Sequence, residues 1–287
     1  MSETPSLIRE TRRILREFGL RPRKGLGQHF LVDRGVLARL LAAADLSPAD
    51  TVIEVGPGLG VLTRELAKAA GQVIAVEKDA QLMEALGQTL SGLANARPVL
   101  ADILAVAPSD LLRDALGQLA PYKVVADLPY YITAPVLRHF LEADSKPSLM
   151  VVMVQKEVAQ NIVAAAGEMS IIAVAVQLYG RPRVMSSVPA SSFYPPPKVD
   201  SAILRIDVYE RLAVDVPDVA TFFKLVRAGF GARRKQIHNA LANNLGLAQA
   251  DASGLLEAAG VDPKRRAQTL SLEEWARLAR GYQEARV

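Results

Sequence analysis

The chain has no cysteine, and its 287 residues include only three histidines and one tryptophan. Without cysteine there can be no disulfides and no thiolate metal ligands, and the scattered positions of His29, His139 and His238 do not form a metal-binding pattern. No uncharged apolar run approaches the ~20 residues that a membrane-spanning helix needs. The N-terminal residues also lack the apolar segment of a secretory signal. These features predict a cytoplasmic protein that needs no metal ion.

Positive charge is concentrated in three short segments. The net charge is only +4, but arginine and lysine cluster within residues 9–24, 222–240 and 264–266. Basic helix faces are often merely solvated. Three separate clusters in one chain of this length nevertheless favour a polyanionic partner such as a nucleic acid.

Apolar runs typical of buried strands alternate with segments typical of helices. Strands are expected at residues 51–55, 73–77, 97–100, 122–126, 149–154, 171–178 and 201–207. Helices are expected at residues 34–44, 60–69, 80–90, 108–117, 134–142 and 156–165. This alternation predicts an α/β fold, in which a mostly parallel sheet carries helices on both faces.

The composition changes near residue 210, and the downstream pattern is helical. Helices are expected at residues 218–230, 233–244, 249–259 and 271–283. Gly246 and Gly260 are placed to end helices, and Ser271 followed by Glu274 forms a capping-box pattern. We therefore expect three parts: a basic N-terminal arm over residues 1–24, a sheet domain over 25–208 and a small all-helical domain over 209–287.

A glycine-rich turn follows the first expected strand, at residues 51–55, and leads into a helix. The apolar run 52–55 leads into the sequence Gly56-Pro57-Gly58-Leu59-Gly60. Glycines allow a tight turn and a close approach of a ligand to the backbone, and the following helix N-terminus adds N–H donors. The spacing is not the G-x-G-x-x-G of dinucleotide-binding folds. Because many strand-to-helix turns contain two glycines, this turn alone is weak evidence of a cofactor site.

Acidic residues follow the next three strands. Glu77 ends the second, Asp102 follows the third and Asp127 follows the fourth. Because ligands of open α/β sheets bind at the carboxyl ends of the strands, Gly56 and these acids are expected at one edge. There Glu77 can accept from ribose hydroxyls and Asp102 from an adenine amine. Each acid alone could be a solvated loop residue, but the set, without the Lys-Ser/Thr of a P-loop, favours S-adenosylmethionine over ATP.

The sequence Asp127-Leu128-Pro129-Tyr130 suits the binding of a planar ring that carries an amino group. Asp127 and the carbonyl groups of Leu128 or Pro129 can accept hydrogen bonds from the amine, and the proline stiffens the turn. The ring of Tyr130 offers a face for stacking. Phe193, in a proline-rich loop, could close the other face or belong to the hydrophobic core. The pattern points to methylation of an adenine amine.

Several motifs resemble those of the small-subunit rRNA adenine dimethyltransferase family (KsgA/RsmA). They are LGQHFL at 26–31, EVGPGLG at 54–60, VE at 76–77, ADIL at 101–104, DLPYYIT at 127–133, QKEV at 155–158 and FYPPPKVDS at 193–201. The resemblance spans nearly the whole chain. It implies a Rossmann-like class I S-adenosylmethionine-dependent methyltransferase sheet with a helical C-terminal domain. It also implies dimethylation of two adjacent adenosines near the 3′ end of 16S rRNA in the 30S subunit, by a monomer with a role in subunit biogenesis.

Matching positions give individual residues roles that the resemblance implies. The cofactor site would comprise His29, Leu31, Gly56, Gly58, Glu77, Asp102 and Asp127. The RNA would be held by Arg23, Lys24, Arg233, Arg234 and Lys235. Two positions depart from the family pattern, since Asp127 stands where Asn is usual and His29 where Asn is frequent. An Asp keeps the acceptor oxygen but loses the NH2 donor.

Three other functions share parts of this pattern. A methyltransferase of the erythromycin-resistance type would modify large-subunit rRNA, but the stretch 195–201 and the long helical tail argue against it. A DNA adenine methyltransferase would need a target-recognition insert, which is not evident. A non-catalytic assembly factor could use the same fold, although the intact set of Glu77, Asp102, Asp127 and Tyr130 favours an enzyme.

Overall fold

The computed structural model describes residues 6–285, apart from residues 24, 26 and 233. Contacts between Cα atoms divide the chain into two compact units. Unit 1 comprises Met1–Ala159 and Pro182–Val208, and unit 2 comprises Gln160–Arg181 and Tyr209–Val287. Residues 160–181 were expected in the sheet domain, but their contacts group them with unit 2. Among the described residues, no helix is both long and apolar enough to cross a membrane.

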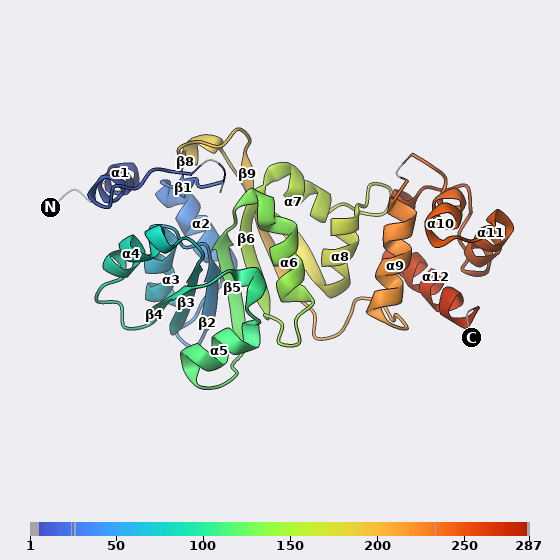
Figure 1. The fold of residues 1–287 in the computed structure, drawn as a ribbon, viewed down its shortest axis with the longest axis horizontal. Helices are drawn as coiled ribbons and strands as arrows, with labels where there is room; N and C mark the ends of the chain where they lie inside the picture. Colours follow the sequence, from blue (N-terminus) through green and yellow to red (C-terminus); the bar gives the residue numbers. More distant parts are fainter. Residues whose placement is uncertain (1–5, 24, 26, 233, 286–287) are drawn as a thin grey trace. The chain divides into compact units, whose positions relative to one another are not determined.

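Unit 1 is built on a seven-stranded sheet with the strand order β4-β3-β2-β5-β6-β9-β7 (Figure 1). The strands are β2 (Thr51–Val55), β3 (Gln72–Glu77), β4 (Ala96–Leu100), β5 (Tyr122–Asp127), β6 (Leu149–Gln155), β7 (Gly180–Val188) and β9 (Ser201–Val208). β4, β3, β2, β5 and β6 pair in parallel, and β9 pairs antiparallel with β6. The chain order reverses beside β2, so the loops after β2 and β5 diverge and leave room for a ligand.

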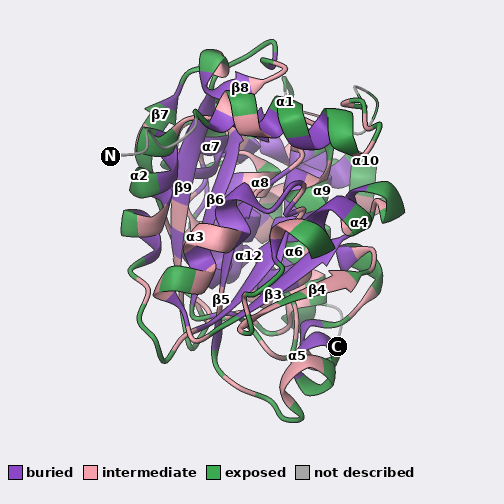
Figure 2. Ribbon diagram, turned by 90° about the vertical axis from the view of Figure 1, so that its left-hand side faces the viewer, coloured by how far each residue is buried: buried purple, intermediate pink, exposed green. Residues whose placement is uncertain are grey.

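The central strands are buried on both faces. Every residue of β2 is buried, and so is all of β6 except its last residue. Figure 2 shows β5, β6 and β9 mostly in the colour of buried residues. Strands that are covered on both faces consist of continuous apolar and β-branched residues, which explains why they could be recognised in the sequence.

The helices of unit 1 follow the strands close to the expected places. They are α2 (Arg34–Ala44), α3 (Val61–Ala69), α4 (Ala80–Thr89), α5 (Pro108–Leu116) and α6 (Thr133–Leu141). The short helix α7 (Lys156–Ile162) begins in unit 1, and its last residues belong to unit 2. Asp33 caps α2 by accepting hydrogen bonds from the N–H groups of Gly35 and Val36. Asp79 caps α4 by accepting from the N–H of Gln81. Such caps contribute about 1 kcal/mol each and fix where a helix begins.

The prediction of a strand at residues 171–178 is wrong. These residues form α8 (Ile171–Tyr179), which Ser170 caps by accepting from the N–H of Ala173. A short apolar run of β-branched residues cannot be assigned to helix or strand from periodicity alone. The strand β7 begins directly after this helix and was not expected, because arginine and proline interrupt it. β7 lies at the sheet edge, where Pro182 is tolerated.

Unit 2 is helical. Besides α8 it contains α9 (Val219–Phe230), α10 (Ile237–Leu245), α11 (Gln249–Ala258) and α12 (Leu272–Glu284). α9 and α12 approach closely at Gly229, where a Cβ atom would lie only 2.5 Å from the ring of Trp275. Trp275 is fully buried and stacks on Phe230. The contact therefore depends on glycine at this position of α9.

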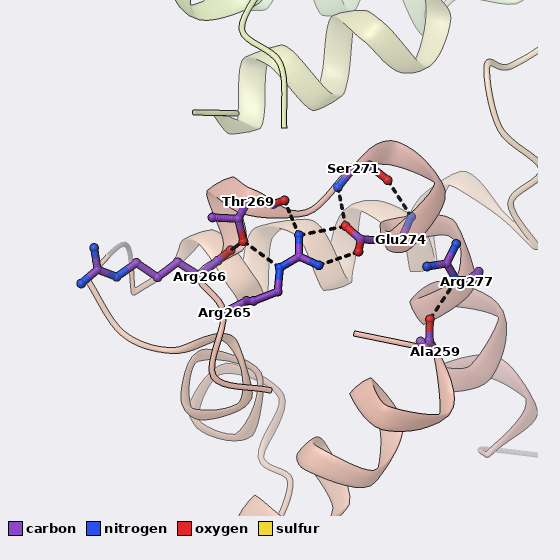
Figure 3. A network of polar contacts seen from close by, with 7 residues as sticks. All are labelled: Ala259, Arg265, Arg266, Thr269, Ser271, Glu274 and Arg277. Carbon is purple, nitrogen blue, oxygen red and sulfur yellow. Dashed lines mark hydrogen bonds and ion pairs between the residues drawn. The ribbon is translucent and has the colours of Figure 1, made fainter. Parts of the chain in front are cut away.

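Arg265 fastens the loop before α12 (Figure 3). Its guanidinium donates to both carboxylate oxygens of Glu274, at 2.5 and 3.1 Å, and to the backbone and hydroxyl oxygens of Thr269. Glu274 also completes the predicted capping box with Ser271. Arg265 is thus part of an internal ion pair, whereas its neighbour Arg266 is exposed and points away from this network.

The N-terminal helix packs against the rest of unit 1. Helix α1 (Leu7–Glu17) buries Leu7, Ile14 and Leu15, and its Glu10 accepts from Arg64 of α3 at 2.6 Å. A short strand β1 (Phe30–Leu31) then pairs antiparallel with β8 (Phe193–Tyr194). This pairing brings the proline-rich loop next to residues 30–31, although the two segments are far apart in sequence.

Candidate active site

The carboxyl ends of four neighbouring strands surround a cavity of about 540 Å³ in unit 1. The glycine turn after β2, Glu77 at the end of β3, Asp102 after β4 and Asp127 at the end of β5 line it. The other lining residues include His29, Leu31, Leu128, Pro129, Tyr130 and Phe193. Every residue that the sequence suggested for the cofactor or the target base therefore lies at one cavity, while their individual roles remain predictions.

The glycine turn adopts backbone conformations that disfavour other residues. Gly56, Gly58 and Gly60 have φ angles of 67°, 58° and 77°. A Cβ atom on Gly58 would lie 3.3 Å from the ring of Phe30, so a side chain there would also crowd the cavity wall. The turn therefore presents bare backbone to the cavity, where a ligand can approach closely.

Glu77 is held in a fixed orientation. Its carboxylate accepts hydrogen bonds from the N–H of Gly58, at 3.2 Å, and from the N–H of Asp79, at 2.8 Å. Burial raises the pKa of Glu77, and these backbone hydrogen bonds partly oppose the rise. Each carboxylate oxygen keeps a free lone pair, so Glu77 can still accept from the hydroxyls of a bound ribose.

Asp102 has a cationic partner that the sequence analysis did not anticipate. The Nζ of Lys78 lies 2.6 Å from one of its oxygens, and the N–H of Leu104 donates to the other at 3.1 Å. The Lys78 hydrogen bond and then the Leu104 hydrogen bond lower the pKa of Asp102. Asp102 is therefore an ionised acceptor at the rim of the cavity.

Glu54 is buried, and Asp127, at the end of β5, is half-buried. Burial raises the pKa of Asp127 to about 8. Burial, and to a lesser extent the neighbouring carboxylate of Glu77, also raises the pKa of Glu54 to about 8. Both groups thus hold a proton near neutral pH. A protonated carboxyl has one acceptor oxygen and one O–H donor, so Asp127 can present the two functions of an Asn amide.

The hydroxyl group of Tyr130 is held by a hydrogen bond. It begins the short 3-10 helix η3 (Tyr130–Ile132), and its hydroxyl lies 2.7 Å from the Oγ of Ser201. The ring is stacked with His29 at a centroid distance of 6.2 Å. The Nδ1 of His29 in turn lies 2.7 Å from the carbonyl oxygen of Pro195. These contacts join the segment after β5 to the N-terminal segment and the proline-rich loop.

Phe193 belongs to the hydrophobic core and also lies at the cavity, while its role toward a base stays a prediction. It is only 3% exposed and belongs to a core cluster with Val36, Leu37 and Leu40 of α2. It also lines the cavity. A ring packed in this way can offer an edge or face to a ligand without moving.

The residues expected to contact RNA fall into different environments. Arg23 lines the cavity, where it pairs with Asp79 at 3.4 Å and donates to Gln81. Arg234 and Lys235 are exposed just before α10. The expectations for Lys24 and Arg233 lie outside the described residues.

Sequence reasoning missed Glu54 and Lys78. Glu54 lies in the cavity wall, 1% exposed, and its Oε2 has no hydrogen-bond partner among the residues that the structure describes. A charged residue inside an otherwise apolar strand was the available signal, because a buried acid needs a partner or a proton. Nothing in the sequence pointed to Lys78, because its partner Asp102 lies in a different loop, 24 positions further along the chain.

The residues at the cavity fit a nucleoside-based cofactor. Bare backbone at Gly58, the carboxylate of Glu77 and the acceptor Asp102 are the donor and acceptor types that an amino-acid moiety, a ribose and an adenine need. The unpartnered Oε2 of buried Glu54 suits a group that the protein itself does not supply. A cavity of this size lies within the range of sites for small molecules.

Solved structures with similar folds define the class of protein. The 23S rRNA methyltransferase ErmE is similar with a TM-score of 0.68 and 30% identity, over 88% of this chain and 99% of that one. A dimethyladenosine transferase from Plasmodium falciparum reaches a TM-score of 0.73 with 22% identity, over 90% and 99% of the two chains. The fold is that of the Rossmann-like class I methyltransferases, which confirms the expected fold class.

The family model for ribosomal RNA adenine dimethylases matches residues 19–278. A relative from Dehalococcoides mccartyi, named ribosomal RNA small subunit methyltransferase A, is 54% identical over 98% of this chain and 95% of its own length. The chain therefore belongs to the ribosomal RNA adenine dimethylase family, as its motifs predicted. The family and the fold imply the use of S-adenosylmethionine and an rRNA substrate.

Proposed function

We propose that this chain dimethylates the N6 amines of two adjacent adenosines near the 3′ end of 16S rRNA, within the 30S subunit, and takes part in small-subunit biogenesis. The observation that carries the proposal is the meeting of two half-sites in one cavity. The glycine turn and Glu77 form one half, and Asp127, Tyr130 and Phe193 form the other. A ribosomal substrate would place the enzyme, which we expect to act as a monomer, in the cytoplasm.

The cofactor half would hold S-adenosylmethionine through this chain's polar groups. The N–H groups of the glycine turn would face its amino-acid moiety, Glu77 its ribose and Asp102 its adenine amine, with His29 and Leu31 on the wall. When bound, this cofactor supplies an electrophilic methyl group. The protein's own contribution is to fix that group beside the segment 127–130.

The base half would orient a poor nucleophile. The adenine amine is weakly nucleophilic because its lone pair is delocalised into the ring. Asp127 and the carbonyl of Leu128 or Pro129 would accept its hydrogens and so localise the lone pair, while Tyr130 and Phe193 would enclose the extruded base. Extrusion costs about a few kcal/mol, which stacking in the pocket offsets. Because the alkylated amine is acidic, alignment and electrostatics suffice without a strong general base.

The RNA backbone would be held by exposed basic residues outside the cavity. In unit 2 the N–H of Ile237 donates to the carbonyl oxygen of Arg265 at 2.7 Å, so the segment with Arg234 and Lys235 lies beside the segment with Lys264 and Arg266. We expect these two basic clusters, which are separate in sequence, to present one surface to the RNA. Helix α1 adds exposed arginines on unit 1.

The test is methyl transfer from labelled S-adenosylmethionine to undermethylated 30S subunits, with 50S subunits as the parallel substrate. Dimethyladenosine, identified by mass spectrometry in the 30S sample alone, is the expected result. Label only in 50S subunits would instead favour the erythromycin-resistance type. No label in either sample, with the cofactor still bound, would favour an assembly factor without catalytic activity.

A further inference from the structure

The hydroxyl of Tyr130 is tied to a distant strand. It lies 2.7 Å from the Oγ of Ser201, the first residue of β9. Ser201 is fully buried and is paired in register with Gln155 at the end of β6. In the sheet β9 is separated from β5 by β6 alone. The hydroxyl of Ser201 is therefore a fixed point to which the segment after β5 is bound through Tyr130.

The rest of Tyr130 has no comparable support from secondary structure. The residue follows Pro129, starts a single turn of 3-10 helix and is half-buried. A phenol ring in such a place can occupy several side-chain rotamers, and only some of them present the ring face to a base between it and Phe193. The contact of its hydroxyl with Ser201, together with the stacking of its ring on His29, selects one of these orientations before a substrate arrives.

The same contact limits what the Tyr130 hydroxyl can do. Its partner Ser201 is buried at the start of β9 and is not among the residues that line the cavity. Burial raises the pKa of Tyr130, so the hydroxyl stays protonated at neutral pH. The group is therefore suited to anchor the ring and not to exchange a proton with the adenine amine.

We propose that Ser201 is a positioning residue for the methyl transfer, which acts by holding the ring of Tyr130 in its stacking orientation. This inference rests on the proposed function, because it assumes that Tyr130 stacks on the target base. It assigns to Ser201 no contact with the substrate or the cofactor.

The experiment compares Ser201→Ala, Tyr130→Phe, the double variant and Ser201→Thr with the wild type. Loss of one neutral hydrogen bond should lower kcat on 30S subunits about three- to tenfold in either single variant. The double variant should lose no more than either single variant, because both remove the same bond. Threonine keeps the hydroxyl and should restore most of kcat, and the Kd for S-adenosylmethionine should stay within about twofold throughout.

Ser186→Ala is the matched control. Ser186 lies on β7 of the same sheet, and its buried Oγ has no hydrogen-bond partner among the described residues. Its removal should leave kcat unchanged. A wild-type kcat in Ser201→Ala, or losses that add in the double variant, would overturn the proposal.

A second measurement does not depend on the identity of the RNA. Carbon-13 labels on the seven tyrosines allow ring motion to be followed by NMR in the protein without RNA. The Tyr130 signal should show faster ring reorientation in Ser201→Ala than in the wild type. Unchanged ring motion would overturn the inference. A protein that methylates neither subunit but shows the faster motion would instead place the fault in the proposed function.

Discussion

At the scale of single residues, the acids at the cavity determine the chemistry. Asp127 stands where the resemblance to the family led us to expect Asn, and burial raises its pKa to about 8. The protonated form offers the same donor and acceptor types as an amide. The substitution thus changes the pH response of the site more than its shape.

Asp127→Asn tests this interpretation. The ionised carboxylate is a stronger acceptor and favours the positive charge that develops on the amine, so wild-type kcat/KM should rise with pH and level off above about 8. The ratio of wild type to variant, measured from pH 6 to 9.5 on 30S subunits, cancels the other titrating groups. It should be close to one at pH 6 and increase severalfold by pH 9. A constant ratio would show that Asp127 does not change protonation in this range.

Glu54 should make the fold more stable at low pH. The unfolded chain loses this proton near 4.5, whereas the folded protein keeps it until about 8. Between these values the folded state binds one more proton, so this group lowers the free energy of unfolding by up to about 1.4 kcal/mol per pH unit as pH rises. Glu54→Gln removes that slope. In urea unfolding, the free energy of unfolding of the variant should therefore increase relative to that of the wild type from pH 5 to pH 8.

Glu84→Gln is the control for this measurement. Glu84 is exposed on α4, so its replacement should leave the pH slope of the unfolding free energy unchanged. Equal slopes for wild type and Glu54→Gln would contradict the assignment of a buried, protonated Glu54.

At the scale of elements, the turn between β2 and α3 shapes the cofactor half of the cavity. Its glycines have positive φ angles, and the residue at position 58 faces the ring of Phe30. A strand followed by such a turn and a helix N-terminus places backbone donors at the carboxyl edge of the sheet. The element therefore acts through its backbone.

Gly58→Ala should weaken the binding of S-adenosylmethionine about tenfold, because the new methyl group strains the turn and presses on Phe30. Isothermal titration calorimetry gives the Kd. Gly117→Ala is the matched control, since Gly117 has a φ of 74° at the end of α5 and a Cβ there meets nothing within 4 Å. Comparable loss of affinity in both variants would indicate general strain and not a local role at the cavity.

At the scale of the whole molecule, folding separates basic residues that are adjacent in sequence. Arg265 pairs with Glu274, while the side chain of Arg266 points away from that pair (Figure 3) and is exposed. The backbone of Arg265 contacts Ile237, close in sequence to Arg234 and Lys235. Proximity in the chain would give both arginines the same role. The structure gives one a part in stability and the other a place on a basic surface.

These neighbours should respond differently to alanine. Arg265→Ala should lower the Tm by about 2–4 °C, because Glu274 loses its partner and the cap of α12 weakens. Arg266→Ala should leave the Tm unchanged but weaken binding to 30S subunits and reduce the salt slope of log K by about one, if it contacts one phosphate. Differential scanning calorimetry and filter binding from 50 to 200 mM salt measure the two effects. An unchanged salt slope in Arg266→Ala would remove Arg266 from the RNA surface.

The amino-acid sequence by itself determined the parallel sheet, the glycine turn and the acids at the strand ends. These features depend on local patterns, namely buried apolar runs, turn residues and the side chain that ends each strand. The sequence also predicted the capping box at Ser271, which needs only two residues three positions apart.

Only the tertiary structure decided the remainder. Whether 171–178 formed a helix or a strand depended on its packing, since its apolar composition suited both. The pairing of Lys78 with Asp102, the anchoring of Tyr130 by Ser201 and the protonation of Glu54 all arise between segments that are distant in sequence. Burial and partners are properties of the folded chain, and they fix the charge and orientation of each group at the cavity.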